Sequence, residues 1–188
     1  MTKRQIFFSF HYGADSWRAS QIRNMGVVSG ESTFSDNDWE KVKRKDEESI
    51  KLWIDSQLQK RSCTIVLIGE GTANRKWINY EIKRSLEMKK GIFGIYIHNL
   101  KDHNKNKSSK GNNPFDYVYY SSWFGIYTLD TFFGRVIHDF VNSTQMSCKI
   151  PCYESKLNDS QKVYNKISEN IQNYIEKAIE QANRDYDL

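Results

Sequence analysis

The 188-residue chain contains no apolar run that approaches the length of a membrane span. A transmembrane helix needs about 20 consecutive, mostly apolar residues. The first residues, Met1 to Gln5, lack the apolar stretch and small-residue cleavage site of a signal peptide, and they lead directly into a strand-like segment. We therefore expect a cytoplasmic protein without membrane contact.

Cysteine is scarce, and its three residues, Cys63, Cys148 and Cys152, cannot all be paired with one another. Cys63 lies in a segment that reads as a buried strand, so a disulfide framework is disfavoured and a reducing compartment fits best. The spacing of Cys148 and Cys152 relative to His138 does not match a zinc site. We expect no metal.

Several well-known catalytic and nucleotide-binding motifs are also missing. The chain has no Gly-x-Gly-x-x-Gly after its first strand and no Gly-x-x-x-x-Gly-Lys-Ser/Thr, which disfavours a Rossmann dehydrogenase and a P-loop NTPase. It has no Gly-x-Ser-x-Gly elbow of a hydrolase. The net charge of +5 would attract an anionic ligand, either dinucleotide or nucleic acid, but lysines do not alternate with aromatics along any strand, so an RNA-recognition sheet is poorly supported.

What is present is an alternation of strands and helices. Hydrophobic periodicity predicts strands at Arg4–Phe10, Cys63–Ile68 and Ile92–Ile97. It also predicts a second strand or an extended edge piece at Gly26–Gly30 and a short fifth strand at Gly125–Thr128. It predicts helices over Asp15–Asn24 (capped by Asp15 or Ser16), Asp46–Arg61, Arg75–Lys90 (with Gly91 just past its end), Asp130–Val141 and Asn158–Ala182, the last opening on a capping box of Asn158 and Gln161. This order predicts an α/β fold, a parallel sheet with helices on both faces.

The domain organisation follows from the same pattern. We expect one domain over residues 1–145 and a C-terminal extension over residues 146–188, a loop followed by a long amphipathic helix. The apolar face of that helix must be buried, either on the same domain or on a partner. The polar segment His98–Pro114 is too long for an ordinary connection, so it is a mobile surface loop or a functional one, and the first reading is preferred.

Two short motifs are candidates for a site. Trp77 and Glu81 are four residues apart in a helix that follows a strand and a glycine-containing turn, so they share a face near the C-terminal end of that strand. The segment Ser9-Phe10-His11-Tyr12 ends the first strand, which should neighbour the Cys63–Ile68 strand at the topological switch point. The plainer interpretations are an exposed, ion-paired glutamate, a core tryptophan and a loop histidine with one local hydrogen bond.

These motifs resemble a known family. Phe7-Phe8-Ser9-Phe10-His11, followed by Asp15, is similar to the opening strand and loop of TIR domains, and Trp77-Ile78-Asn79-Tyr80-Glu81 resembles the Trp-x-x-x-Glu motif of NAD-consuming members. The overall pattern over residues 4–141 looks most like the TIR-like proteins of the bacterial Thoeris antiphage system, the ThsB type. The resemblance implies a flavodoxin-like fold with a five-stranded parallel sheet.

The resemblance also implies a function. Members cleave the bond between nicotinamide and ribose in NAD, which is a substrate and not a cofactor, and Thoeris-type members make a cyclic ADP-ribose isomer that activates a separate effector during phage infection. By position, Glu81 matches the catalytic glutamate, and Trp77, Ser9, Phe10, His11 and Tyr12 match residues that bind the substrate. The chain departs from the common pattern between Gly26 and Asp46, which leaves open whether Asp36 or Asp38 reaches the pocket.

The chemistry is compatible with a single carboxylate. Glycosidases use two because the leaving oxygen must be protonated, whereas the nicotinamide of NAD is already cationic and departs neutral. The expected partners are NAD and an effector that responds to the product, and the candidates for further partners are a phage-derived trigger and a second copy of the chain. The alternatives are a non-catalytic TIR-like adaptor, a nucleotide binder without turnover and, least supported, a nucleic-acid binder.

Overall fold

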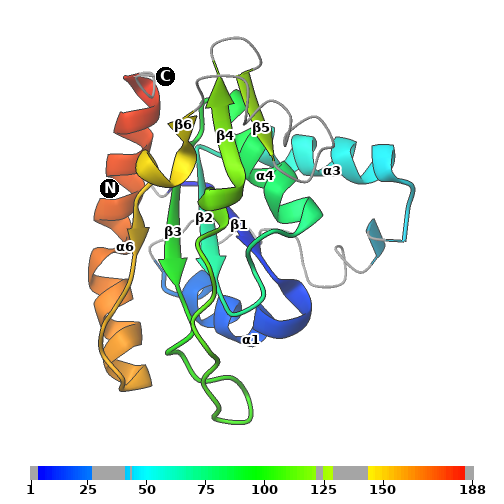
Figure 1. Ribbon diagram of the computed structural model, residues 1–188. Coiled ribbons are helices and arrows are strands. Elements are labelled where there is room, and N and C mark those ends of the chain that lie inside the picture. The colour runs from blue at the N-terminus through cyan, green and yellow to red at the C-terminus, as the bar shows by residue number, and fades with distance from the viewer. Residues whose placement is uncertain (1–3, 27–40, 43, 122–124, 129–143, 185–188) are drawn as a thin grey trace.

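The computed structural model describes residues 4–26, 41–42, 44–121, 125–128 and 144–184. Within them, a parallel sheet has the strand order β1-β2-β3-β7. Its strands are β1 (Ile6–Phe10), β2 (Cys63–Ile68), β3 (Gly91–Tyr96) and β7 (Cys152–Tyr153). The described part of the chain thus confirms an α/β fold with a parallel sheet, and β1 and β2 are neighbours as predicted (Figure 1).

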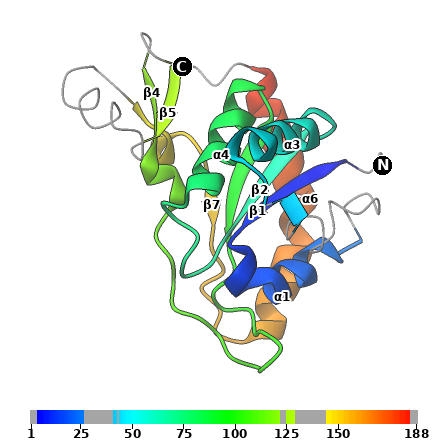
Figure 2. The same cartoon turned by 90° about the vertical axis from the view of Figure 1, so that its right-hand side faces the viewer.

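Helices cover both faces of this sheet. They are α1 (Tyr12–Arg23), α3 (Glu47–Gln59), α4 (Lys76–Glu87) and α6 (Ser160–Asn183). Along β2, Cys63, Ile65 and Leu67 pack with residues of α1 and α6, whereas Val66 and Ile68 pack with residues of α4. Side chains alternate between the two faces of a strand, so an apolar residue at every position of β2 is what a central parallel strand requires. Figures 1 and 2 show α6 and α4 on opposite sides of the sheet.

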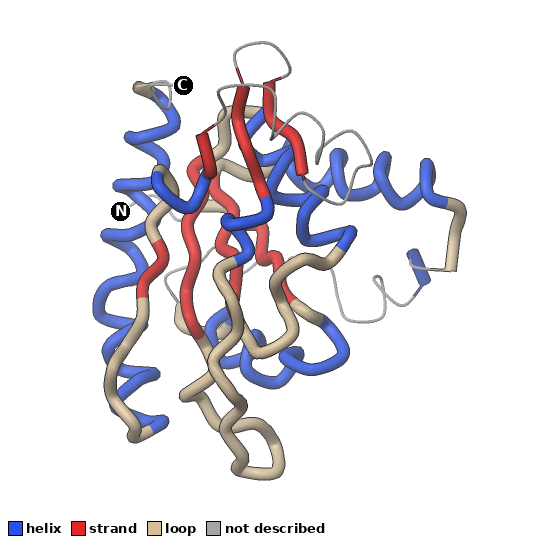
Figure 3. The backbone as a smooth tube through the Cα atoms, viewed as in Figure 1, coloured by secondary structure: helices blue, strands red, loops and turns tan. Residues whose placement is uncertain are grey.

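A second, antiparallel sheet lies beside α4. It has the order β5-β4-β6, formed by β4 (Val118–Ser121), β5 (Gly125–Thr128) and β6 (Thr144–Gln145), and it is flanked by the short 3₁₀ helices Pro114–Tyr117 and Met146–Cys148 (Figure 3). The strand expected at Gly125–Thr128 is therefore present, but it pairs with β4 and not with the parallel sheet. The described residues give that parallel sheet four strands, so its expected five-strand count is not confirmed.

Two helix ends differ from the sequence prediction. The first helix begins at Tyr12 with His11 as its N-cap, because the backbone N–H of Asp15 already bonds to the His11 carbonyl, and Asp15 lies buried in the first turn. Helix α4 ends at Glu87, and Lys89 takes a left-handed φ of 53° that turns the chain into the sheet. Gly91 is consequently the first residue of β3 and not the residue that terminates the helix.

The other two helix starts are closer to expectation. Asp46 caps α3 as predicted, with its carboxylate accepting a 2.9 Å hydrogen bond from the backbone N–H of Ser49. For α6 the capping residue is Asp159 and not Asn158, since the Asp159 carboxylate accepts from the backbone N–H of Lys162 at 2.9 Å. Three sequence predictions fall on residues that the structure does not describe. They are the strand at Gly26–Gly30, of which Gly26 alone is described, the helix over 130–141, and the question of whether Asp36 or Asp38 reaches the pocket.

The polar segment after β3 is fastened to α1 by a buried arginine. Arg18, which is 4% exposed, donates to the carbonyls of Leu100 at 2.9 Å and Asn106 at 3.0 Å. It also forms ion pairs with Asp15 at 3.2 Å and with Asp102 at 3.4 Å. The segment is therefore held against the domain by charge-assisted bonds, in place of the free surface loop preferred from the sequence.

Helix α6 covers the sheet with its apolar stripe. Its buried residues include, at helical spacing, Val163, Ile167, Ile171, Ile175, Ala178 and Ala182. From Val163 to Ala178 the stripe packs in the same cluster as strand residues such as Phe93 and Ile95, and Ala182 packs in the cluster of Val66 and Ile68, so the extension is buried on its own domain. No helix among the described residues has the length and apolar character needed to cross a membrane.

Replacing Gly91 with Ala is expected to destabilise the protein by about 1–3 kcal/mol, because the added methyl overpacks the contact with α6. A Cβ at Gly91 would lie 2.8 Å from the backbone of both Ala178 and Ile179. Urea unfolding monitored by circular dichroism measures the change. Glu169→Ala, on the exposed side of α6, is the control and should shift stability by less than about 0.5 kcal/mol. Equal stabilities for Gly91→Ala and wild type would contradict the close packing.

Candidate functional site

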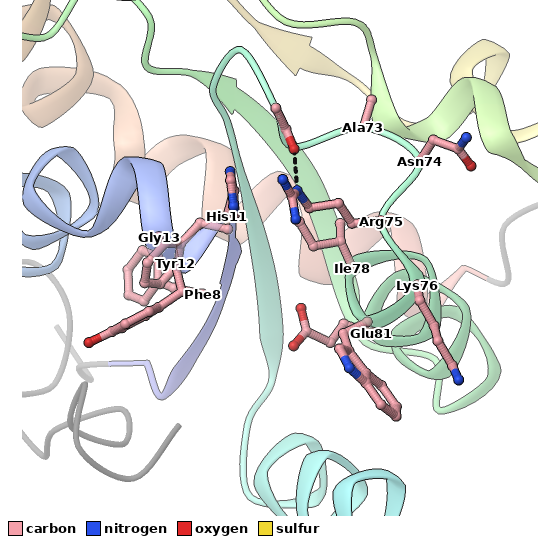
Figure 4. Close-up of a pocket in the computed structure, with 13 residues that line it drawn as sticks. Phe8, His11, Tyr12, Gly13, Ala73, Asn74, Arg75, Lys76, Ile78 and Glu81 are labelled. Carbon is pink, nitrogen blue, oxygen red and sulfur yellow. Dashed lines mark hydrogen bonds between the residues drawn. The ribbon is translucent and has the colours of Figure 1, made fainter. Parts of the chain in front are cut away.

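A pocket of about 830 Å³ opens at the C-terminal ends of β1 and β2. Figure 4 shows residues from the β1 end on one side and from the turn before α4 on the other. The residues that line it are Phe8, Phe10, His11, Tyr12, Gly13, Gly71, Ala73, Asn74, Arg75, Lys76, Trp77, Ile78 and Glu81. This is the edge of an open α/β sheet at which ligands bind, and the volume is within the range of small-molecule sites.

The pairing of β1 with β2 brings the two sequence motifs together. Phe10 is in register with Leu67, so the chain leaves both strands at the same level of the sheet. The segment after β1 enters α1 directly, and the turn after β2 leads into α4. Thr72 closes that turn, since its hydroxyl accepts from the backbone N–H of Gly69 at 2.9 Å. Five of the six residues predicted for the site from the sequence line the pocket, namely Phe10, His11, Tyr12, Trp77 and Glu81.

Glu81 is a buried carboxyl group with one hydrogen-bond donor. Its residue is 7% exposed, and the Ser9 hydroxyl donates to its Oε2 at 2.6 Å. Burial raises the pKa of Glu81 to about 8, and the bond from Ser9 opposes this rise. The sequence suggested a glutamate at the edge of the core that is negatively charged. Burial instead favours the protonated form of this carboxyl at neutral pH.

Ser9 lies beneath the pocket and is not part of its lining. It is 1% exposed and shares the face of β1 that carries Phe7, which packs under α3 and α4. A polar residue on this apolar face needs a partner, because an unpaired buried hydroxyl is costly. Glu81 is that partner. Ser9 therefore contacts the carboxyl group of the site, whereas the sequence had suggested contact with the substrate.

A second pair of hydroxyls holds the backbone of the same helix turn. Ser85 donates to the Glu81 carbonyl at 2.7 Å, and its oxygen lies 2.8 Å from the Thr64 hydroxyl on β2. All three residues are buried. Two strands thus hold Glu81 in position. Ser9 on β1 bonds to its side chain, and Thr64 on β2 contacts Ser85, which bonds to its backbone carbonyl.

Trp77 has two roles in the structure. Its partly buried ring packs against the cluster formed by Phe7, Val42, Ile50, Ile54 and Leu58, and it contacts Tyr80 edge-on at 6.3 Å between ring centroids. The same residue lines the pocket. The Lys76 ammonium lies 5.2 Å from the centre of the ring, which is within the range of a cation–π contact. Trp77 therefore fixes α4 on the sheet and also presents a surface to the pocket.

His11 faces the turn after β2. Its Nδ1 is buried and has no hydrogen-bond partner in the described structure. Burial lowers the pKa of His11, and the positive charge of Arg75 lowers it further. Both effects favour the neutral form of the imidazole. Phe10 and Tyr12 continue the wall on this side, with ring centroids 6.2 Å apart.

The sequence motifs missed the turn that precedes Trp77. Gly71, Ala73, Asn74, Arg75 and Lys76 all line the pocket. One signal was available. Arg75 and Lys76 stand at the start of a helix, where the macrodipole favours anions and disfavours cations. Two cations at such a position oppose the dipole, which is a signal that they have a role other than stabilising the helix. Groups of three or more histidine, cysteine or acidic residues that could hold a metal are absent from the residues described.

A family model supplies the relationship that these features suggest. The model described as "Thoeris protein ThsB, TIR-like domain" matches residues 7–102, just over half of the chain. The chain belongs to the Thoeris ThsB family of TIR-like proteins. The matched region contains β1, α1, α3, β2, α4 and β3, and therefore the whole pocket.

A curated relative is similar over much of this TIR-like protein. It is the "Putative cyclic ADP-D-ribose synthase ThsB1" of Bacillus cereus (strain MSX-D12), 42% identical over 125 residues. The match covers 64% of this chain and 65% of the relative, so the chain is matched to less than two thirds of the relative's length.

Replacing Glu81 with Gln is expected to stabilise the fold at alkaline pH. The pKa of Glu81 is higher in the folded state than its ordinary value of 4.5, so the stability contributed by the protonated carboxyl is complete below 4.5 and is lost as the pH rises through about 8. Gln cannot ionise and can still accept from Ser9. The variant should gain roughly 4 kcal/mol over wild type between about pH 5 and pH 9.

Melting temperatures recorded across that pH range measure this gain. Glu87→Gln is the control, because Glu87 lies on the same helix but outside the pocket, with its side chain 31% exposed and ion-paired to Arg84. A Glu81→Gln difference that does not change with pH would show that the carboxyl is not held protonated in the folded state.

Proposed function

We propose that this TIR-like protein is an enzyme that cleaves the bond between nicotinamide and ribose in NAD and joins the remaining ADP-ribose into a cyclic product. The observation that carries the proposal is a single buried carboxyl group, Glu81, in a pocket at the C-terminal edge of the sheet. The name of the Bacillus cereus relative, a cyclic ADP-D-ribose synthase in its printed title, supports the product class.

One carboxyl group suffices for this bond. The electrons of the C–N bond return to the pyridinium ring, and nicotinamide leaves as a neutral molecule that needs no proton. The ribose that remains carries oxocarbenium character, which a carboxylate stabilises by charge and by hydrogen bonds to the ribose hydroxyls. Ser9 contributes by holding Glu81 Oε2, so that the carboxylate does not have to reorient during the reaction.

The cationic substrate itself provides the ionised form of Glu81. Burial by the protein alone raises the pKa of Glu81 to about 8. A pyridinium ring beside the carboxyl favours the charged form and lowers that pKa. Binding of NAD therefore releases a proton from Glu81. When nicotinamide departs as a neutral molecule, the positive charge passes to the ribose, and the Glu81 carboxylate is then the counter-charge of the ribose.

Cyclisation requires that water be kept from the ribose while another atom of the same molecule attacks it. The aromatic side chains of Phe10, Tyr12 and Trp77 line the pocket and suit this requirement. They also offer flat surfaces for the adenine and nicotinamide rings. The product, in this proposal, is a signal that activates a separate effector after phage infection.

Glu81→Gln is expected to lower the rate of nicotinamide release by at least about 100-fold, since the developing positive charge loses its counter-charge. Purified protein is incubated with NAD, alone and with lysate of phage-infected cells, and nicotinamide and cyclic products are measured by liquid chromatography and mass spectrometry. Glu87→Gln, with the same change on the same helix, should retain activity. Equal rates in Glu81→Gln and wild type would remove Glu81 from the reaction. No nicotinamide release by the wild type in either mixture would favour a non-catalytic adaptor.

Ser9→Ala is expected to shift the pH profile of kcat/KM to higher pH by roughly 0.5–1 unit. The hydrogen bond from Ser9 lowers the pKa of Glu81, so its loss raises that pKa, and one such bond is worth about 1 kcal/mol. Ser85→Ala is the matched control, because Ser85 contacts the Glu81 carbonyl and not the carboxylate. An equal shift in both variants would indicate a packing effect in place of the direct bond.

A further inference from the structure

The walls of the pocket carry an excess of positive charge. Arg75 and Lys76 are the two basic residues of its lining, and Glu81 is the single acidic one. Glu81 is recessed at 7% exposure, whereas Arg75 and Lys76 are exposed at the entrance to α4. The charge that a ligand meets first is therefore positive.

Arg75 differs from the structural arginines of the fold. Arg4, Arg18 and Arg84 each form an ion pair with a carboxylate. The hydrogen bond of Arg75 is instead to a neutral group, with its Nε donating to the Gly71 carbonyl at 2.5 Å (Figure 4). No carboxylate in the described part of the chain lies within ion-pair distance of it. A guanidinium held by a backbone carbonyl keeps its other N–H groups for an anion.

Lys76 is less available than Arg75. Its ammonium is bonded to Glu47 on α3 and also lies over the Trp77 ring. Lys76 thus adds positive potential, while part of its hydrogen-bonding capacity is used within the fold. Arg75 is consequently the cation best placed to contact a ligand directly.

His11 lies on the other side of Gly71 from this guanidinium. A Cβ built on Gly71 would lie 3.2 Å from His11 Nδ1 and 3.6 Å from an Arg75 Nη atom, so the two side chains flank the same point of the turn. The buried Nδ1 of His11 has no partner in the described structure. An anion at this point of the pocket would meet a guanidinium and an imidazole from two different loops.

The spacing along α4 relates this position to Glu81. Arg75 is the N-cap of the helix and Glu81 is six residues further on, a rise of about 9 Å. The N-terminus of α4 has no side-chain cap and its first turn contains no acidic residue, so the dipole of α4 reinforces the positive field of the side chains. Both residues line the same pocket, so a ligand that reaches Glu81 and extends along α4 also meets Arg75.

We propose that Arg75 and His11 form a diphosphate subsite, which selects nucleoside diphosphate sugars and dinucleotides over nucleosides that lack phosphate. The position of the ribose relative to this subsite rests on the proposed function. The diphosphate accepts from the guanidinium of Arg75 and the imidazole of His11, and Lys76 adds to the attraction at longer range.

Isothermal titration calorimetry of the full chain tests this subsite with three probes: inorganic pyrophosphate, ADP-ribose and nicotinamide riboside. Arg75→Gln is expected to weaken pyrophosphate and ADP-ribose by about 10–100-fold, the usual cost of losing a hydrogen bond to a charged group. Nicotinamide riboside, which has no phosphate, should bind both proteins alike. Arg75→Lys should recover part of the loss. Arg184→Gln, at a side chain 82% exposed on α6, removes the same charge away from the pocket and should change nothing.

The outcomes separate this inference from the proposed reaction. Arg75-dependent binding of pyrophosphate and ADP-ribose by a protein that does not cleave NAD supports the subsite and removes the activity. Cleavage of NAD with an unchanged KM in Arg75→Gln, together with unchanged ADP-ribose affinity, overturns the subsite and leaves the activity intact. An equal loss for nicotinamide riboside also overturns it, because Arg75 would then support the shape of the pocket in general.

Discussion

The hydrogen bond between Ser9 and Glu81 is the interaction on which the site depends. It joins the C-terminal part of β1 to the second turn of α4, next to the apolar cluster around Phe7. Burying a carboxyl group costs free energy, and a single hydroxyl offsets only part of that cost. The fold tolerates the group because it can remain protonated, as its pKa of about 8 indicates. A carboxyl that the fold alone holds neutral becomes charged readily when a cation arrives, which is the property a reaction at a pyridinium glycoside needs.

The rest of the pocket is organised by loops that hold one another. Arg18 on α1 binds the carbonyls that follow β3, and Gly111 approaches the turn after β2 so closely that a Cβ there would lie 1.9 Å from the Gly69 carbonyl oxygen. Ser109 adds a bond from its backbone N–H to Glu70 at 3.2 Å. The segment after β3 is thus connected both to α1, which follows β1, and to the turn that follows β2. The walls that carry His11 and Arg75 are therefore fixed before any ligand is bound.

Much of this structure was predictable from the sequence, and the failures have physical causes. The apolar run Cys63–Ile68 is a strand at the predicted bounds, because a fully buried parallel strand has a distinct composition. The adjacency of β1 and β2, which brings His11 toward Trp77, followed from α/β topology. The burial of Glu81 did not, because helical periodicity assigns a residue to a face but not its depth beneath a strand. The start of α1 was misplaced because Asp15 resembles a cap in sequence, while tertiary packing buries it against Arg18. The strand Gly125–Thr128 was found, but local pattern does not determine with which sheet a strand pairs.

The contact between Gly91 and α6 limits where this protein can meet other molecules. The helix backbone approaches the first residue of β3, and the stripe from Val163 to Ala178 covers one face of the sheet. That stripe is therefore already occupied within the chain. An effector, a phage component or a second copy that assembled through it would have to remove the helix and expose the hydrophobic core. Assembly through the C-terminal helix must therefore use its polar outer side, and recognition there would be governed by charge.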